Sequence, residues 1–342
     1  MGYIDLRSDT VTHPTPEMRE AMYRAEVGDD VYRDDPSVNA MEEESARILG
    51  TESALFVSSG TMGNQLGIMV HTHRGDEIIA GAESHIFTSE VGGAAVLSGA
   101  NIRQMIYPNS IPVPELIEGA IRTDDIHDPP TALICLENAL ANGRVVPLDV
   151  MKKVARVAKK HKLPVHLDGA RIFNAAVSLG CEAKDIMKHV DSVSCCLSKG
   201  LCAPVGCVFA ASREKVERAR KYRKMLGGGT RQAGILAAAA LIAIRDMPKR
   251  LWEDHENAAY MARRLAELPG IEVDLSSVQV NIVFFNIARP RAMLDAIPAK
   301  MKELGVLVNP EENGMMRFVT HYGVAKQDVD RAIDAFAQVI GK

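Results

Sequence analysis

Short apolar segments alternate with longer stretches of helical periodicity between about residue 54 and residue 200. The apolar segments are rich in Val, Ile, Leu and Cys and show little polar alternation, which is typical of strands buried on both faces. They occupy residues 54–57, 77–80, 131–137, 164–168 and 192–198. Between them, apolar residues recur at helical spacing. The pattern predicts an α/β domain, with a mostly parallel sheet and helices on both of its faces.

The pattern changes in the last quarter of the chain. Residues 231–247 are predicted to form a helix whose small side chains allow close packing. A small α+β domain is predicted after it, with strands at 271–275, 280–288 and 315–321 and helices at 292–305 and 327–341. The first 40 residues hold too few apolar side chains for a core of their own. We therefore predict three parts: an N-terminal segment at 1–40 that packs on the small domain or a partner subunit, a large domain at 41–248, and the small domain at 249–342.

Composition and charge favour small-molecule partners. The chain has 342 residues, 47% of them apolar, and a net charge of −4 from 40 basic and 44 acidic residues spread along its length. Such a charge distribution offers no basic surface for nucleic acid or for an anionic membrane. No signal peptide or long apolar run is visible, so a cytoplasmic location is predicted. The six cysteines lack metal-binding spacing, and we predict neither a metal site nor disulfides.

Two polar residues follow neighbouring apolar segments at the spacing of one strand–helix–strand unit. Asp168 closes the segment 164–168, and Lys199 comes 31 residues later, just after the segment 192–198. Asp168 alone is equally consistent with a helix cap, and the two together with a simple ion pair. Pyridoxal phosphate (PLP) needs this combination: an amine for a Schiff base and a carboxylate that keeps the ring nitrogen protonated. The pKa of such a lysine has to be lowered by burial and neighbouring cations.

Further residues at predicted strand ends suit the rest of that cofactor and an amino-acid substrate. The segment 58–64, SSGTMGN, precedes a helix and could cradle a phosphate, although it is also an ordinary loop. The segment 223–234, with Lys224 and Arg231, could reach the same phosphate or be a mobile loop. His85 could stack on the ring, or be a capped or core histidine. Arg171 and Arg317 could bind a carboxylate, or lie on the surface.

Seven segments, in order through nearly the whole chain, resemble one enzyme family. They are DLRSDTVTHPT, VGDDVYRDDP, SSGTMGNQ, SHIF, HLDGARIFNAA, CLSKGLCAPVG and RKMLGGGTRQAG. The family is that of the low-specificity L-threonine aldolases, PLP-dependent enzymes of the aspartate aminotransferase fold type in the β-eliminating lyase superfamily. The resemblance implies reversible cleavage of L-threonine, L-allo-threonine or a related β-hydroxy-α-amino acid to glycine and an aldehyde.

The resemblance also implies a role for each matching residue. It makes Lys199 the Schiff-base lysine, Asp168 the partner of the pyridinium and His85 the stacking and catalytic histidine. Gly60 and Thr61 would bind the phosphate, while Ser8, Arg171 and Arg317 would hold the substrate carboxylate. Members of the family form homodimers, often paired into tetramers, whose sites are shared between subunits. Tyr32 is then expected at the substrate, and Lys224 and Arg231 at the cofactor, in part across the subunit interface.

One segment departs from the family pattern. Where the family commonly has Glu-Asn-Thr-His-Asn, this chain has Ala139 and Leu140 in place of the Thr-His pair. A candidate base or hydroxyl anchor is missing, which affects the expected threo/allo preference, the aldehyde accepted and the reaction itself. His127 precedes the strand and is not expected to substitute.

Other functions remain to be weighed. The alternative within the same cofactor class is β-elimination, or an aldolase for a different β-hydroxy amino acid. Outside that class stand a Rossmann-like nucleotide-binding protein and a non-catalytic ligand-binding module. No GxGxxG segment opens a helix after a predicted strand, which argues against the Rossmann-like protein.

Overall fold

The computed structural model describes residues 2–312 and 314–341. The chain divides into two compact units, a larger one of Pro14–Ala141 and Val145–Pro248 and a smaller one of Met1–His13, Asn142–Arg144 and Lys249–Lys342. The predicted N-terminal segment 1–40 is divided between the two units, and residues 14–40 lie in the larger one. The reason is packing: helices α1 (Pro16–Arg24) and α2 (Pro36–Leu49) both lie against the alanine-rich helix α10 (Gly234–Asp246).

The larger unit is built on a seven-stranded sheet. Its strand order is β2 (Ser53–Val57), β8 (Cys207–Ala211), β7 (Ser192–Cys196), β6 (Val165–Asp168), β5 (Thr131–Glu137), β3 (Glu77–Gly81) and β4 (Asn101–Met105). The five strands from β7 to β4 are parallel, and β8 runs antiparallel to both of its neighbours. The predicted α/β fold with a mostly parallel sheet is therefore confirmed.

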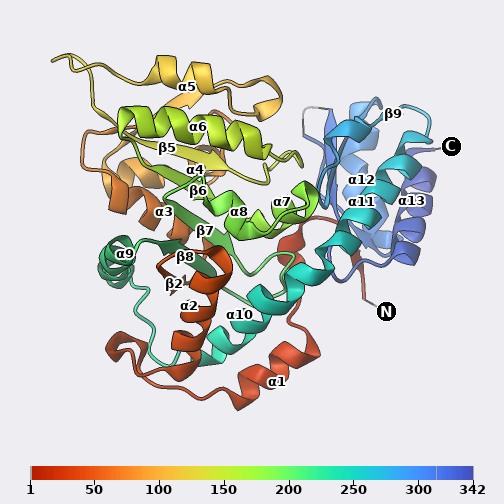
Figure 1. Cartoon of the computed structure of the whole chain (residues 1–342). Helices are drawn as coiled ribbons and strands as arrows, with labels where there is room; N and C mark the ends of the chain where they lie inside the picture. The colour runs from red at the N-terminus through yellow and green to blue at the C-terminus, as the bar shows by residue number, and fades with distance from the viewer. Residues whose placement is uncertain (1, 313, 342) are drawn as a thin grey trace. The chain divides into compact units, whose positions relative to one another are not determined.

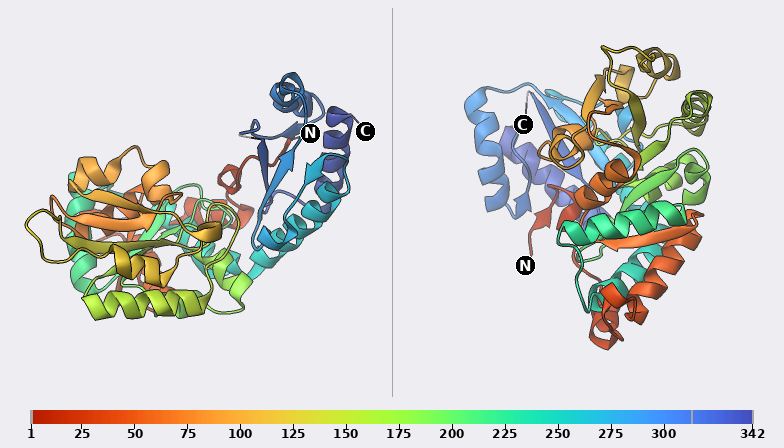
Figure 2. Two further views of the ribbon diagram at one scale, coloured as in Figure 1. Left: turned by 90° about the horizontal axis from the view of Figure 1, so that it is seen from above. Right: turned by 90° about the vertical axis from the view of Figure 1, so that its left-hand side faces the viewer.

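Helices cover both faces of this sheet (Figure 1). Helix α3 (Gly60–His71) packs on β7 and β8 beside α9 (Arg213–Met225). On the opposite face lies α6 (Leu148–His161), as the left-hand view of Figure 2 shows. The remaining helices of the unit are α4 (His85–Thr88), α5 (Pro114–Ala120), α7 (Ile172–Leu179) and α8 (Ala183–Met187). Such coverage explains the continuous apolar strands, because neither face of the central strands meets water.

Two strands of the sheet were not predicted. Strand β8 follows β7 after a short connection and was not among the predicted apolar segments. Strand β4 carries Asn101, Arg103 and Gln104 because it lies at the sheet edge, where a polar strand is stable. The edge position of β4 and the reversed direction of β8 are tertiary features that hydrophobic periodicity does not report.

The smaller unit has its own core around a three-stranded antiparallel sheet, β12 (Met315–Val319), β10 (Ile282–Ile287) and β9 (Ile271–Glu272). Helices α11 (Leu251–Ala266), α12 (Arg291–Glu303) and α13 (Lys326–Ile340) supply most of the remaining apolar side chains. Phe285, Phe318 and Phe336 meet edge to face at its centre. Strand β1 (Ile4–Asp5) pairs in parallel with β11 (Val306–Leu307), which ties the N-terminus to this unit. Across the described residues, no helix is both long and apolar enough to span a bilayer.

Candidate active site

Polar side chains gather at the carboxyl ends of the central strands. In the parallel ladder, Glu137 at the end of β5 lies opposite Asp168 at the end of β6, and Asp168 lies opposite Ser194 of β7. Because ligands of open α/β sheets bind at this edge, the residues that follow β5, β6 and β7 form the candidate site.

Asp168 is buried and its carboxylate is held by two donors. Asn64, one turn into α3, donates its Nδ2 to Asp168 Oδ2 at 2.8 Å, and the backbone N–H of Ala170 donates to Oδ1 at 3.0 Å. Both donors fix the orientation of the carboxylate. The structure thus holds a carboxylate in place at the end of β6.

Lys199 lies in the turn that follows β7, in a partly buried position. The turn is closed by a hydrogen bond from Cys202 N to Lys199 O at 2.9 Å. Lys199, Asp168 and Arg171 all act electrostatically on the Cys196 thiol, whose pKa falls to about 7, first because of its hydrogen bond with Cys207. Lys199, Asp168 and Arg171 therefore lie near one another at the carboxyl ends of the strands, as predicted for residues that follow strands.

His85 begins helix α4 just after β3 and joins the same cluster. Its Nδ1 lies 2.8 Å from Glu90 Oε1, and its backbone N–H donates to Glu137 Oε2 at 3.0 Å. The hydrogen bond with Glu90 raises the pKa of His85; Asp168 adds to the rise and Lys199 opposes it. One side-chain nitrogen or oxygen atom from each of His85, Glu90 and Asp168 lies within 4.8 Å of the other two. The imidazole is thus held among carboxylates, with Lys199 close by.

Glu137 is a half-buried residue at the edge of the same cluster. Its Oε1 accepts the backbone N–H of Ala141 at 2.7 Å, while Oε2 accepts that of His85. Burial, followed by the nearby charge of Asp168, raises the pKa of Glu137 to about 7. Glu137 therefore holds together two segments, the start of α4 and the loop after β5.

The start of helix α3 offers a place for a phosphate. Ser59 caps the helix by accepting the N–H of Met62 at 3.2 Å, and Gly60 and Thr61 follow as its first residues. A Cβ added to Gly60 would lie 2.5 Å from Cys196 Sγ, so only glycine lets the helix start this close to β7. The exposed backbone N–H groups and the helix dipole favour an anion here.

The segment at 223–234 also approaches this helix. A Cβ on Gly228 would contact Met62 in the first turn of α3, and one on Gly229 would lie 2.7 Å from Cδ of Lys224. Arg231 forms an ion pair with Asp29 at 3.0 Å, and Tyr32 is 74% exposed. Lys224, Arg231 and Tyr32 are thus on or near the surface of the larger unit.

Ser8 and Arg317 belong to the smaller unit. Arg317 donates from Nη2 to the carbonyl oxygen of Arg7 at 3.2 Å, directly beside Ser8. Ser8 Oγ accepts the backbone N–H of Thr10 at 3.2 Å. The structure therefore brings these two predicted carboxylate-binding residues together within that unit.

A buried hydrogen-bonded chain runs from Asn64 to the opposite ends of the strands. Asn64 Oδ1 faces His166 Nε2 at 3.3 Å, and Ser192 Oγ lies 2.9 Å from both His166 Nδ1 and His71 Nε2. Since Asn64 donates its amide to carboxylates, its oxygen must accept from His166, and Ser192 must donate to His166. Burial lowers the pKa of His166 to about 4 and that of His71 to about 3. Both histidines are therefore neutral at physiological pH.

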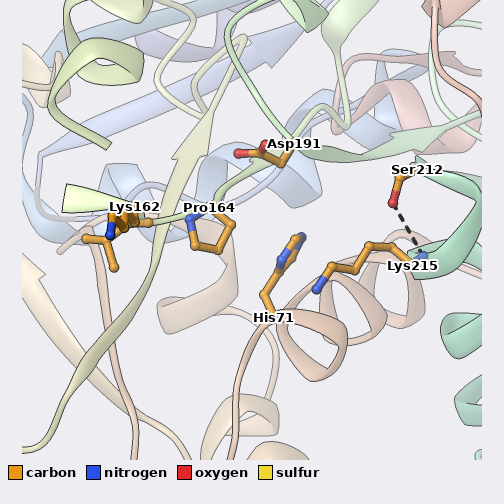
Figure 3. A pocket seen from close by; sticks show the side chains of 7 residues that line it. His71, Lys162, Pro164, Asp191, Ser212 and Lys215 are labelled. Carbon is orange, nitrogen blue, oxygen red and sulfur yellow. Dashed lines mark hydrogen bonds between the residues drawn. The ribbon is translucent and has the colours of Figure 1, made fainter. Parts of the chain in front are cut away.

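His71 lines a pocket at the amino ends of β6 and β7 (Figure 3). The other lining residues are Lys162, Leu163, Pro164, Asp191, Ser212 and Lys215. Lys162 and Pro164 precede β6, and Asp191 precedes β7. The pocket is thus at the opposite ends of the strands from Asp168 and Lys199, and it is not the candidate site.

Three residues of the cluster were not recognised from the sequence: Asn64, Glu90 and Glu137. Asn64 had a usable signal, because a polar side chain among buried helical neighbours needs a buried partner. Glu137 closes a predicted strand in the same way as Asp168. Glu90 had no comparable signal, since its carboxylate reaches the cluster only after the chain turns back toward α3.

Comparisons with known proteins identify a family for this chain. Residues 5–288 match the beta-eliminating lyase family. A protein of Arabidopsis thaliana named probable low-specificity L-threonine aldolase 2 is 43% identical, over 98% of this chain and 97% of its own length. The low specificity L-threonine aldolase of Escherichia coli (strain K12) is 42% identical, over 95% of this chain and 96% of its own. This chain belongs to the beta-eliminating lyase family.

A solved structure of threonine aldolase from Leishmania major has the same fold as this beta-eliminating lyase family member. It aligns with a TM-score of 0.83 at 19% identity and covers 99% of this chain and 100% of that one. The resemblance inferred from the seven sequence segments is confirmed by the identities to the Arabidopsis and Escherichia proteins. Membership of a lyase family also rules out the Rossmann-like and non-catalytic alternatives.

Proposed function

We propose that this chain is a cytoplasmic, PLP-dependent aldolase that reversibly cleaves L-threonine, L-allo-threonine or a related β-hydroxy-α-amino acid to glycine and an aldehyde. One observation carries the proposal: in a chain 43% identical to a threonine aldolase, Asp168, Lys199, Arg171 and His85 meet beside the start of α3. An amine, a fixed carboxylate and an anion-binding helix start are the three groups that PLP requires.

The residues of the larger unit fit that cofactor. Lys199 would bind its aldehyde carbon, Asp168 would hold the proton on its ring nitrogen, and His85 would stack on the ring. Gly60 and Thr61 would hold its phosphate, because the bare backbone of Gly60 leaves the N–H groups of the helix start accessible. When bound, PLP supplies an electron sink for the pair left on Cα after bond cleavage.

The remaining residues would orient and deprotonate the substrate. Arg171, Arg317 and Ser8 would bind its carboxylate, and this orientation selects which bond to Cα breaks. A base, either a water molecule or His85, would take the proton of the β-hydroxyl, whose O–H electrons become the carbonyl bond of the aldehyde. The Cα–Cβ pair stays on Cα, which is protonated to give glycine.

A second candidate reaction is β-elimination, which the family's description favours. There the base takes the Cα proton and a group leaves Cβ, so that a 2-oxo acid and ammonia form. The relatives from Arabidopsis thaliana and Escherichia coli, 43% and 42% identical to this chain, are named low-specificity L-threonine aldolases. We therefore favour the aldol cleavage.

Product analysis separates the two reactions. Purified protein with added PLP is incubated with L-threonine, L-allo-threonine and phenylserine, and the aldehyde, glycine, 2-oxo acid and ammonia are quantified. Aldol cleavage gives glycine and aldehyde in equal amounts, whereas elimination gives 2-oxo acid and ammonia. Release of neither pair from any of the three substrates would refute the proposal.

We also infer a homo-oligomer, a dimer or tetramer, with sites shared between subunits. The exposed side chain of Tyr32 and the surface positions of Lys224 and Arg231 suit a neighbouring subunit's site. Light scattering gives the oligomeric state. Mixed oligomers of Lys199→Ala and Arg231→Ala chains test the sharing, because only shared sites can regain activity when two inactive chains combine.

A further inference from the structure

The carboxylate of Glu90 is fully buried between α3 and α4 and is bound by three side chains. Its Oε1 lies 2.8 Å from both Asn64 Nδ2 and His85 Nδ1, and its Oε2 lies 2.7 Å from Gln65 Nε2. A carboxylate can only accept hydrogen bonds, so His85 must carry its hydrogen on Nδ1. The structure therefore determines the tautomer of His85.

The other ring nitrogen of His85 is left open. Nε2 makes no hydrogen bond to any residue that the structure describes, and the side chain is 40% exposed. In the neutral ring this nitrogen has a lone pair that can take a proton. Nδ1 of His85 is therefore fixed by its hydrogen bond to Glu90, and Nε2 is the nitrogen that can accept a proton.

The other acid–base groups of β5, β6 and the β7 loop already have partners or assigned roles. His166 is buried with both ring nitrogens bonded, and both carboxylate oxygens of Glu137 accept backbone N–H groups. Asp168 accepts from Asn64 and Ala170. Lys199 is assigned to the cofactor. His85 Nε2 is the nitrogen that remains for a substrate hydroxyl.

The backbone after Glu90 adds an independent observation. Val91 has φ of 55°, in the left-handed region that β-branched residues avoid, and its side chain is 96% exposed. That side chain contributes no packing that could offset the unfavourable backbone. The next residues bring Gly93 against Gln65, where an added Cβ would lie 2.7 Å from Gln65 Cδ. The turn thus serves to direct Glu90 inward and to hold its partner Gln65.

We propose that Glu90 is a positioning residue for the cleavage step: it holds the Nδ1–H of His85 and so makes His85 Nε2 the base that takes the substrate's hydroxyl proton. This role rests on the proposed aldolase function. The proton passes from the hydroxyl oxygen to Nε2, the O–H electrons form the aldehyde C=O, and the Cα–Cβ pair remains on Cα.

The charges that face His85 come from four elements or loops. Glu90 after α4, Asp168 of β6 and Lys199 after β7 act on the ring, and Glu137 of β5 binds its backbone N–H. The Glu90 hydrogen bond is the largest of these effects and raises the pKa of His85. Replacing Glu90 by Gln keeps the shape of the side chain and removes its charge, so the pKa of His85 should fall.

The first test compares Glu90→Gln with Glu83→Gln in the holoenzyme. Glu83 is on the same segment, and its carboxylate bonds to Ser110 rather than to the cluster. Diethylpyrocarbonate modifies neutral imidazole, so the pH midpoint of His85 labelling, followed by peptide mass spectrometry, reports its pKa. We expect the midpoint to fall by about one pH unit in Glu90→Gln. An unchanged midpoint would overturn the proposal. This readout does not depend on aldolase activity, so it stands apart from failure of the proposed function.

The second test measures turnover with L-threonine. Glu90→Gln should lower kcat by roughly 10-fold to 100-fold, leave KM within about twofold, and move the acidic limb of the pH–rate profile with the labelling midpoint. Loss of stability alone would not move that limb. Glu83→Gln should match the wild type in all three quantities.

A double-mutant cycle separates a role of Glu90 through His85 from an independent one, and its first arm, His85→Asn, does not depend on how Glu90→Gln folds. In His85→Asn the amide can replace the Nδ1–H donor to Glu90, while the Nε2 base is absent. This variant should lose about 100-fold in kcat, and adding Glu90→Gln to it should change kcat by less than about twofold. A further large loss would show that Glu90 acts independently of His85 and would overturn the proposal. Full activity of His85→Asn would do the same.

Discussion

The two ends of the parallel strands carry histidines in opposite electrical surroundings. At the carboxyl ends, His85 is bonded to Glu90 and lies near Asp168, and its pKa is raised. At the amino ends, His71 lies in the pocket of Figure 3 beside Lys215, and burial first, then nearby cations, lowers its pKa to about 3.

The pocket and the candidate active site are therefore at opposite ends of the parallel strands. The pocket at the amino ends contains a neutral histidine, an exposed lysine and a half-buried one. The carboxyl ends contain an amine, two buried carboxylates and an imidazole that can exchange a proton. The difference arises because each parallel strand leads into its loop at the same edge, so residues distant in sequence meet there.

The largest effect that this comparison predicts is at Lys199. Lys199→Ala should lower aldehyde release by roughly 10³-fold or more, because the only amine assigned to the cofactor is removed. Lys215→Ala, at the amino ends, is the matched control and should stay within about twofold of the wild type. Equal losses in the two variants would contradict the placement of the site. Coupled measurement of acetaldehyde from L-threonine provides the assay.

A smaller loss of activity is expected when a carboxylate is removed at the carboxyl ends of the strands. The same change at the amino ends serves as the control. Asp168→Asn should lower kcat by about 10²-fold to 10³-fold, since the amide cannot stabilise a proton on the ring nitrogen. The control is Asp191→Asn; Asp191 accepts the N–H of Val165 at 2.8 Å at the start of β6. That variant should change thermal stability more than kcat. A kcat for Asp168→Asn close to that of the wild type would exclude the assigned role.

Filling the space at the start of α3 should weaken cofactor binding. Gly60→Ala would place a Cβ 2.5 Å from Cys196 Sγ, and overpacking of this kind costs about 1–3 kcal/mol. We expect the Kd for PLP, from absorbance titration of the apoprotein, to rise about tenfold. The second change Cys196→Ala should recover most of that loss. Gly119→Ala, whose Cβ would meet nothing within 4 Å, is the control.

The smallest predicted effect is on stability in acid. The pKa of His166 falls from 6.5 to about 4 on folding, so the unfolded chain binds more protons between these two values. His166 therefore contributes a loss of stability as the pH falls from 6.5 toward 4, with a slope of about 1.4 kcal/mol per pH unit. Urea unfolding of the apoprotein should show a shallower pH slope in His166→Gln than in the wild type. Identical slopes would mean that His166 is not neutral when folded.

Much of the fold was predictable because burial on two faces leaves a direct mark on composition. Strands β2, β3, β5, β6 and β7 all correspond to predicted apolar segments. Strand β4 escaped prediction because an edge strand keeps polar residues. Strand β8 escaped because a reversed neighbour needs only a short connection from β7, and apolar composition says nothing about direction.

Part of the candidate site was predictable for a related reason. Asp168 and Lys199 follow apolar strands one structural unit apart, and both are found at the carboxyl ends of neighbouring strands. Asn64 and Glu90 were not found, because their importance depends on contacts between α3 and a loop more than twenty residues away. Nothing in the local sequence around Glu90 distinguishes it from a surface glutamate.

The amino-acid sequence by itself determined the class of the fold, the family and the set of chemical groups at the strand ends, since these follow from local composition and from motifs read in order. Only the tertiary structure decided which of those groups form hydrogen bonds with one another. Asn64 bridges Asp168 and Glu90, and Glu90 assigns the proton on His85, because hydrogen bonds form between side chains that folding brings within 3 Å. The division of His85 into a held nitrogen and an open one is therefore a property of the folded chain.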